Sequence, residues 1–111
     1  MAPGKRIRSE LRKLAGVAYR RELDQELRGL WGWFERWKTD EVDCFELSDK
    51  IHEFHDGISR QLFVLYGRLK PDMAVGRAVA RDLLSIDEVP SEILTEVESK
   101  IESFRGETEA C

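Results

Sequence analysis

Apolar residues recur every three or four positions along most of this chain, which is the period of amphipathic helices. A first series extends from Ile7 to Trp37. Its apolar line shifts near Ala18 and Tyr19, so one kinked helix and two consecutive helices are both compatible with residues 6–38. The sequence therefore predicts about thirty helical residues before the first break in the pattern.

A second apolar series is the most regular signal in the sequence. Its members are Leu47, Ile51, Phe54, Ile58, Leu62, Leu65 and Leu69. Thr39 or Asp40 is a suitable N-cap, and Pro71 forbids continuation. Gly57 disfavours a helix, but the period continues on both sides of it, so we predict one long helix.

Two shorter helices are predicted in the last third of the chain. The first has Asp72 as its cap and ends near Ser85. The second has Ser91 as its cap and buries an apolar side that extends to Phe104, and a polar tail follows at 106–111.

Four amphipathic helices with short connections predict an all-α fold, an antiparallel bundle of about four helices of which one or two are long. The 111 residues suit one helical domain over 1–111, with disordered tails expected at 1–5 and 106–111. Charged residues make up 36% of the chain and hydrophobic residues 41%, which favours exposed helices over a buried parallel sheet.

No stretch reaches the roughly 18 apolar residues of a membrane-spanning helix, and the basic N-terminus lacks the apolar core of a secretory signal. Cys44 and Cys111 form no CxxC motif, and we expect both to be free thiols. These features favour a cytoplasmic protein without a membrane partner.

An aromatic cluster at the end of the first series is the first candidate site, and it comprises Trp31, Trp33, Phe34 and Trp37. Trp31 and Trp33 lie on opposite sides of Phe34 in helical projection, so the apolar arc spans roughly 160° and one neighbouring helix would not cover it. Because Trp is enriched at the centres of interfaces, the cluster predicts a homo-oligomer, with a dimer favoured, or another protein partner. The alternative is a broad monomer core with one partly exposed indole.

The second candidate site lies in the long predicted helix and comprises Asp49, His52, His55 and Asp56. Imidazole nitrogen and carboxylate oxygen together suit a divalent transition metal, the one cofactor that the sequence suggests. An imidazole there could also act as an acid or base near neutral pH. The competing interpretation is boundary packing, in which His52, His55 and Tyr66 bond to each other or to a neighbouring helix.

The third candidate site is the basic N-terminal segment, with Lys5, Arg6, Arg8, Arg12 and Lys13. Residues 1–21 hold seven basic residues against one acidic residue, although the whole chain has a pI near 5.3. Such a segment could bind nucleic-acid phosphates, or pair with acidic surfaces of its own chain or of a partner. Nucleic acid is the weaker alternative, because no known nucleic-acid-binding motif is present.

No catalytic motif and no phosphate-binding glycine loop occurs in the sequence. We therefore expect a non-enzymatic helical binding protein that associates with itself through the aromatic cluster. Metal binding and nucleic-acid binding are the two alternatives.

Overall fold

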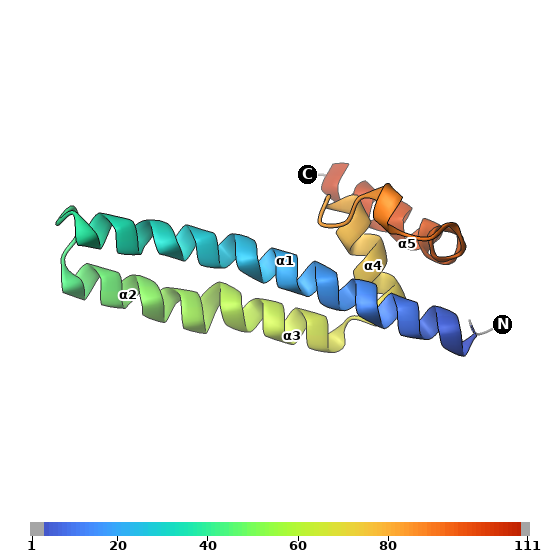
Figure 1. Ribbon diagram of the computed structural model, residues 1–111, viewed down its shortest axis with the longest axis horizontal. Helices are drawn as coiled ribbons and strands as arrows, with labels where there is room; N and C mark the ends of the chain where they lie inside the picture. The colour runs from blue at the N-terminus through green and yellow to red at the C-terminus, as the bar shows by residue number, and fades with distance from the viewer. Residues whose placement is uncertain (1–3, 110–111) are drawn as a thin grey trace. The chain divides into compact units, whose positions relative to one another are not determined.

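The computed structural model describes residues 4–109, and every regular element in this range is helical (Figure 1). The elements are α1 (Lys5–Lys38), α2 (Cys44–Phe54), η1 (His55–Ser59), α3 (Arg60–Arg68), α4 (Pro71–Ala80), η2 (Ile86–Glu88) and α5 (Ser91–Glu109). The predicted all-α fold is confirmed. Within the described range, no helix is both long and apolar enough to cross a membrane.

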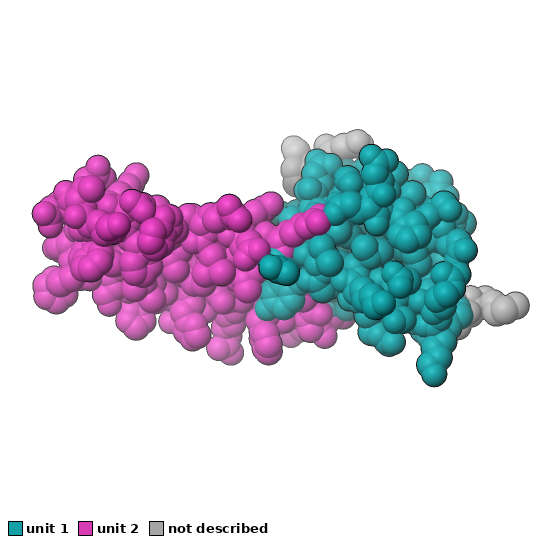
Figure 2. Space-filling view, in the orientation of Figure 1, with its two compact units in different colours: residues 1–20, 69–111 teal, residues 21–68 magenta. Residues whose placement is uncertain are grey.

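The chain separates into two compact units, shown in teal and magenta in Figure 2. Unit 1 contains residues 1–20 and 69–111, and unit 2 contains residues 21–68. That residues 1–111 form one domain stays a prediction. Of the two predicted tails, Lys5 belongs to α1 and 106–109 belong to α5, whereas 1–3 and 110–111 lie outside the described residues.

Residues Lys5–Lys38 form one continuous helix, which resolves the alternative that the sequence left open. The helix ends at a left-handed residue, Asp40, whose φ is 63°. The Asp40 N–H donates to the Trp37 carbonyl and the Glu41 N–H donates to the Arg36 carbonyl, at 3.1 and 2.9 Å. This pair of bonds is a Schellman motif, which satisfies the last carbonyl groups of α1.

The residue that starts α2 differs from the sequence-based prediction. The Asp43 side chain accepts a hydrogen bond of 2.8 Å from the Glu46 N–H and caps the helix. Thr39 instead donates to carbonyl groups in the last turn of α1. The N-cap therefore lies three residues later than Asp40, because Asp40 is needed to end the preceding helix.

The second long helical run is kinked at Gly57, where a π-helical turn, η1, joins α2 to α3. Gly57 in this turn has non-helical angles, φ −97° and ψ −105°. The sequence predicted one long helix over this segment, and the structure instead has two α-helices on either side of this kinked turn. The low helix propensity of Gly57 still has a local effect, because the π turn forms around it.

Unit 2 is a hairpin in which residues 21–38 of α1 lie beside α2, η1 and α3 (Figure 1). Among its described hydrophobic residues, only Leu47 and Leu62 are buried. Other members of the predicted apolar line are half-buried, and Ile51 is exposed. The hairpin alone does not bury its apolar surface, because each helix has only one neighbour within it.

Unit 1 holds most of the buried hydrophobic side chains, in and around α4 and α5. Its largest fully buried side chains are Leu84, Ile93, Val75 and Val97. The two helices approach so closely that a Cβ atom on Gly76 would stand 2.4 Å from the Lys100 Cβ atom. Glycine at this position is therefore a condition for the packing of α4 against α5.

The helix ends in unit 1 correct three sequence-based predictions. Helix α4 ends at Ala80 instead of Ser85, because Asp82 adopts φ 60° and the Leu83 N–H donates to the Ala78 carbonyl in a second Schellman motif. Lys70, not Asp72, is its N-cap residue, with Pro71 at the first helical position. Helix α5 starts with Ser91 itself, and the Pro90 carbonyl accepts from the Ile93 and Leu94 N–H groups.

Candidate interface

The aromatic side chains of α1 lie in unit 2, near the turn that joins α1 to α2. Trp31 stacks on Phe34, with ring centroids 6.0 Å apart and planes inclined by 18°. Trp31 nevertheless leaves 57% of its surface exposed, and Trp37 leaves 44% exposed. The stack is therefore an ordered aromatic surface that the hairpin does not cover.

Trp33 has different surroundings from Trp31. The Arg36 guanidinium and the Lys50 ammonium lie 4.7 and 4.6 Å from the centroid of its ring, so two cations contact one indole. Trp33 also lines a hollow of about 350 Å³, together with Gly29 from α1 and Glu53 from α2. This half-buried tryptophan joins the two helices of the hairpin along one side.

The exposed aromatic surface lies on the other side of the hairpin. Trp31 is about 160° from Trp33 around α1, at about 100° per residue. Two antiparallel helices pack along a line of contact. From that line, an equal rotation around each helix, taken in its own N-to-C direction, leads to the same side of the helix pair. Trp31 is about 100° ahead of Leu30, and Phe63 is likewise about 100° ahead of the buried Leu62, so both side chains lie on this side.

The same projection places further apolar residues beside Trp31. We call this surface the apolar face, and it comprises Leu27, Trp31, Phe34, Ile51 and Phe63. All of these except Phe34 are exposed. The sequence identified the aromatic members on α1 but missed Leu27, Ile51 and Phe63. The signal for Phe63 was its position directly after Leu62, outside the helical apolar line.

The structure does not gather the predicted metal ligands into one site. Asp49, His52, His55 and Asp56 are all exposed along α2 and η1. Among the side chains of residues 4–106, no group of three or more His, Cys, Asp or Glu residues is arranged to hold a metal ion. The same residues therefore include no set of ligands from several helices, which a bundle metal site requires.

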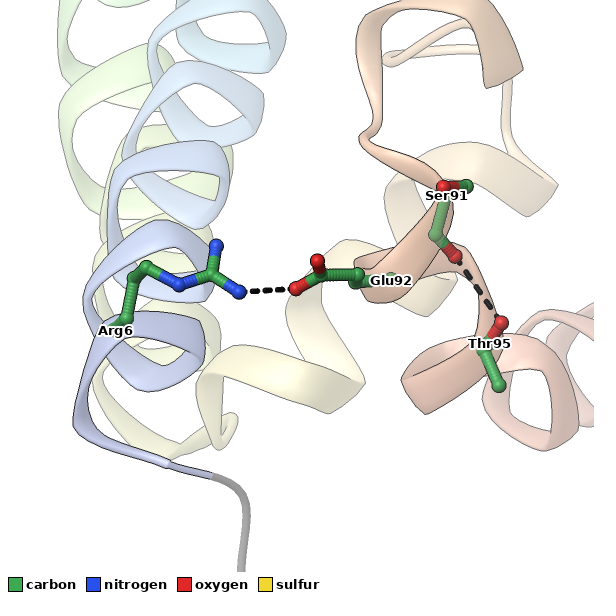
Figure 3. Close-up of polar contacts among 4 residues, drawn as sticks. All are labelled: Arg6, Ser91, Glu92 and Thr95. Atoms are coloured by element: carbon green, nitrogen blue, oxygen red, sulfur yellow. Dashed lines mark hydrogen bonds and ion pairs between the residues drawn. The ribbon is translucent and has the colours of Figure 1, made fainter.

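The basic N-terminal residues divide into two groups within unit 1. Arg6 forms an ion pair with Glu92 of α5 (Figure 3), and Lys13 lies 3.5 Å from Glu10. Arg8 and Arg12 instead line a hollow with residues 70–72. Lys5 is exposed. Part of the basic segment therefore pairs with acidic groups of its own chain, as one of the sequence-based alternatives predicted.

A buried acidic residue escaped the sequence analysis. Glu22 is 8% exposed, and Tyr66 donates a hydrogen bond of 2.8 Å to its Oε1 atom. The bond joins α3 to α1 inside unit 2. The helical period of the sequence does not predict this burial, and the hydroxyl of Tyr66 is one partner that permits it.

No known family model, curated protein or solved structure matches this chain. Fold alone does not define a function.

Proposed function

We propose that this protein is a non-enzymatic helical protein that self-associates, and that two hairpins pair through their apolar faces. The observation that carries this proposal is the exposure of Trp31 and its apolar neighbours in a unit with little core. Pairing two hairpins gives a four-helix bundle, in which each helix gains a second neighbour.

The distribution of buried and exposed apolar residues supports a missing partner for unit 2. In the described part of the chain, two of the fourteen buried hydrophobic residues belong to unit 2, and the other twelve belong to unit 1. Seven of the nine exposed large hydrophobic residues belong to unit 2. Exposed apolar surface concentrated in this way is typical of an interaction site.

The charge pattern of the hairpin supports a second copy as that partner. The half near the α1–α2 turn, residues 30–56, holds three basic and eight acidic residues, a net charge of −5. We call this half the tip. The open end, residues 21–29 and 57–68, holds four basic and three acidic residues, a net charge of +1. The hairpin is thus electrostatically complementary to a second hairpin that lies in the opposite direction.

Two-fold symmetry allows two ways to place one apolar face on another. An axis parallel to the helices would put both tips at the same end of the bundle, where their charges repel. An axis perpendicular to the helices puts each tip beside the partner's open end, with α1 beside α1 and α3 beside α2. Around such an axis near residue 58, Asp56 of one copy lies level with Arg60 of the other, and Asp49 with Arg68. We propose this antiparallel pairing.

The test is the mass of the intact chain in solution, measured by sedimentation equilibrium and native mass spectrometry over a range of concentrations. We expect a dimer of the 12.9 kDa chain, and dissociation to a monomer in Trp31→Glu and Phe63→Glu. The matched control is Phe45→Glu, because Phe45 is also an exposed aromatic residue but lies about 160° from Leu47, away from the apolar face.

A monomer mass at every concentration would overturn the proposal. So would a Trp31→Glu variant that remains as dimeric as the Phe45→Glu control. Helix content from circular dichroism is compared among the variants, so that loss of the dimer is separated from loss of the fold.

A further inference from the structure

A hollow of about 290 Å³ in unit 1 is lined by side chains from α1 and from the start of α4. Its lining residues are Arg8, Leu11, Arg12, Lys70, Pro71 and Asp72. Three of these are basic and one is acidic, so the lining carries a net charge of +2. This volume is at the lower end of the roughly 300–1,000 Å³ of ligand pockets, which indicates a small ligand.

The basic side chains that line this hollow differ from other basic residues of the N-terminal segment in their ion pairs. Arg6 and Lys13 form ion pairs with Glu92 and Glu10. Arg8, Arg12 and Lys70 take part in no ion pair with the side chains of residues 4–106. These three basic side chains therefore line the hollow without an ion pair to a described carboxylate.

Asp72, the acidic residue of the lining, already has partners. Its Oδ1 atom accepts a hydrogen bond of 2.9 Å from the Met73 N–H. Its Oδ2 atom lies 4.0 Å from the Lys100 ammonium, which partly neutralises the carboxylate. Asp72 therefore leaves Arg8, Arg12 and Lys70 available to another anion.

Local structure brings these groups together. Arg8 and Arg12 are four residues apart, so they share one face of α1. Leu11, 3% exposed, lies between them in the sequence and is the apolar residue of α1 that lines the hollow. Pro71 and Asp72 are the first residues of α4, so the partial positive charge of the helix N-terminus adds to the same field.

We propose that this hollow binds the phosphoryl group of a small phosphomonoester. Such a group carries about −1.5 to −2 charges at neutral pH, which matches the net charge of the lining. The planar guanidinium groups of Arg8 and Arg12 can each donate two hydrogen bonds to phosphate oxygens, and Lys70 supplies a further positive charge. Leu11 and Pro71 are placed to contact an apolar substituent of the ester.

The test is a titration of the full chain with inorganic phosphate and with phenyl phosphate at constant ionic strength, followed by amide chemical shifts. We expect saturable shifts centred on residues 8–12 and 70–73, with tighter binding of phenyl phosphate. Both probes carry a phosphoryl group. Equal affinity for them would show that the phenyl substituent adds nothing, and would identify free phosphate as the ligand.

Variants define the site. Arg12→Gln and Lys70→Gln each remove one charge from the hollow and are expected to weaken binding about tenfold. Arg20→Gln is the matched control, because Arg20 is an exposed arginine of α1 outside the hollow, and we expect it to leave binding unchanged.

Three results would overturn the proposal. The first is the absence of saturable shifts with either probe at millimolar concentration. The second is an equal loss of binding in Arg12→Gln, Lys70→Gln and Arg20→Gln, which would indicate diffuse attraction to a basic helix. The third is a chain that binds DNA but not phenyl phosphate, with DNA binding weakened equally by all three variants. That result would favour a nucleic-acid surface instead.

Discussion

Tyr66 of α3 donates a hydrogen bond of 2.8 Å to the buried side chain of Glu22 in α1. The two residues are 44 positions apart in the sequence, and their bond joins the helices of the hairpin near its open end. It is a polar contact in a unit with few buried apolar side chains, so its contribution to the stability of that unit can be measured.

Replacing Tyr66 with Phe removes this hydrogen bond and keeps the aromatic ring. We expect the free energy of unfolding to fall by about 1–2 kcal/mol, because a polar group in the hairpin then loses one partner. The measurement is urea-induced unfolding at fixed protein concentration, since self-association would also affect stability. The control is Thr95→Ala, which removes an exposed hydrogen bond to the Ser91 carbonyl (Figure 3). Equal stability of Tyr66→Phe and the parent chain would contradict this prediction.

Gly76 sets the distance between α4 and α5. A methyl group there would stand 2.4 Å from the Lys100 Cβ atom and 3.1 Å from the Ile101 nitrogen, so the two helices would have to separate. We expect Gly76→Ala to destabilise the protein by about 1–3 kcal/mol. Gly16→Ala is the matched control, because open space surrounds that helical glycine and alanine favours a helix. Thermal unfolding should move in opposite directions for the two variants.

Asp40 and Asp82 both adopt left-handed backbone angles at the C-termini of helices, with φ of 63° and 60°. Glycine takes this conformation without a steric cost, whereas alanine does not. We expect Asp82→Gly to be more stable than Asp82→Ala by about 1–2 kcal/mol, and the same order at Asp40. Chemical denaturation of the four variants measures these differences, and no difference at either position would show that the turns relax.

The antiparallel pairing of hairpins predicts which thiols can be cross-linked. With Cys111→Ser, Cys44 is the remaining cysteine, and it lies about 21 Å along the helical run from the proposed two-fold axis near residue 58. In the antiparallel dimer the two Cys44 residues are then about 42 Å apart, beyond a cross-linker that spans about 15 Å. With both tips at one end, the two Cys44 thiols would be within its reach.

A complementary variant gives the positive signal. His55→Cys, combined with Cys44→Ser and Cys111→Ser, puts the thiol close to the proposed two-fold axis, and we expect efficient cross-linking of this dimer. Cross-linking through Cys44 but not through position 55 would establish the opposite orientation. A dimer mass with that outcome would leave self-association intact, so orientation and association are tested separately.

At the candidate sites, the sequence reveals the position of each residue on its own helix but not the neighbours that other helices bring to it. The wide aromatic arc around Phe34 predicted that Trp31 and Trp33 face different sides, and the structure shows Trp31 exposed and Trp33 under two cations. The proximity of Lys50 to Trp33 could not be predicted, because it depends on the register between two helices. The two imidazoles and two carboxylates at Asp49, His52, His55 and Asp56 suggested a ligand set, but ligands from another helix are not implied by any local pattern.

The sequence by itself determined that this protein is helical, and it located most of the helical segments. Helical period, proline and capping chemistry act over a few residues, so they can be recognised in the order of the chain. Tertiary structure decided that Glu22 is buried against Tyr66, that Gly76 must be glycine, and that Arg8 and Arg12 meet Lys70 at one hollow. These relationships join residues far apart in the sequence, and they depend on how whole helices pack.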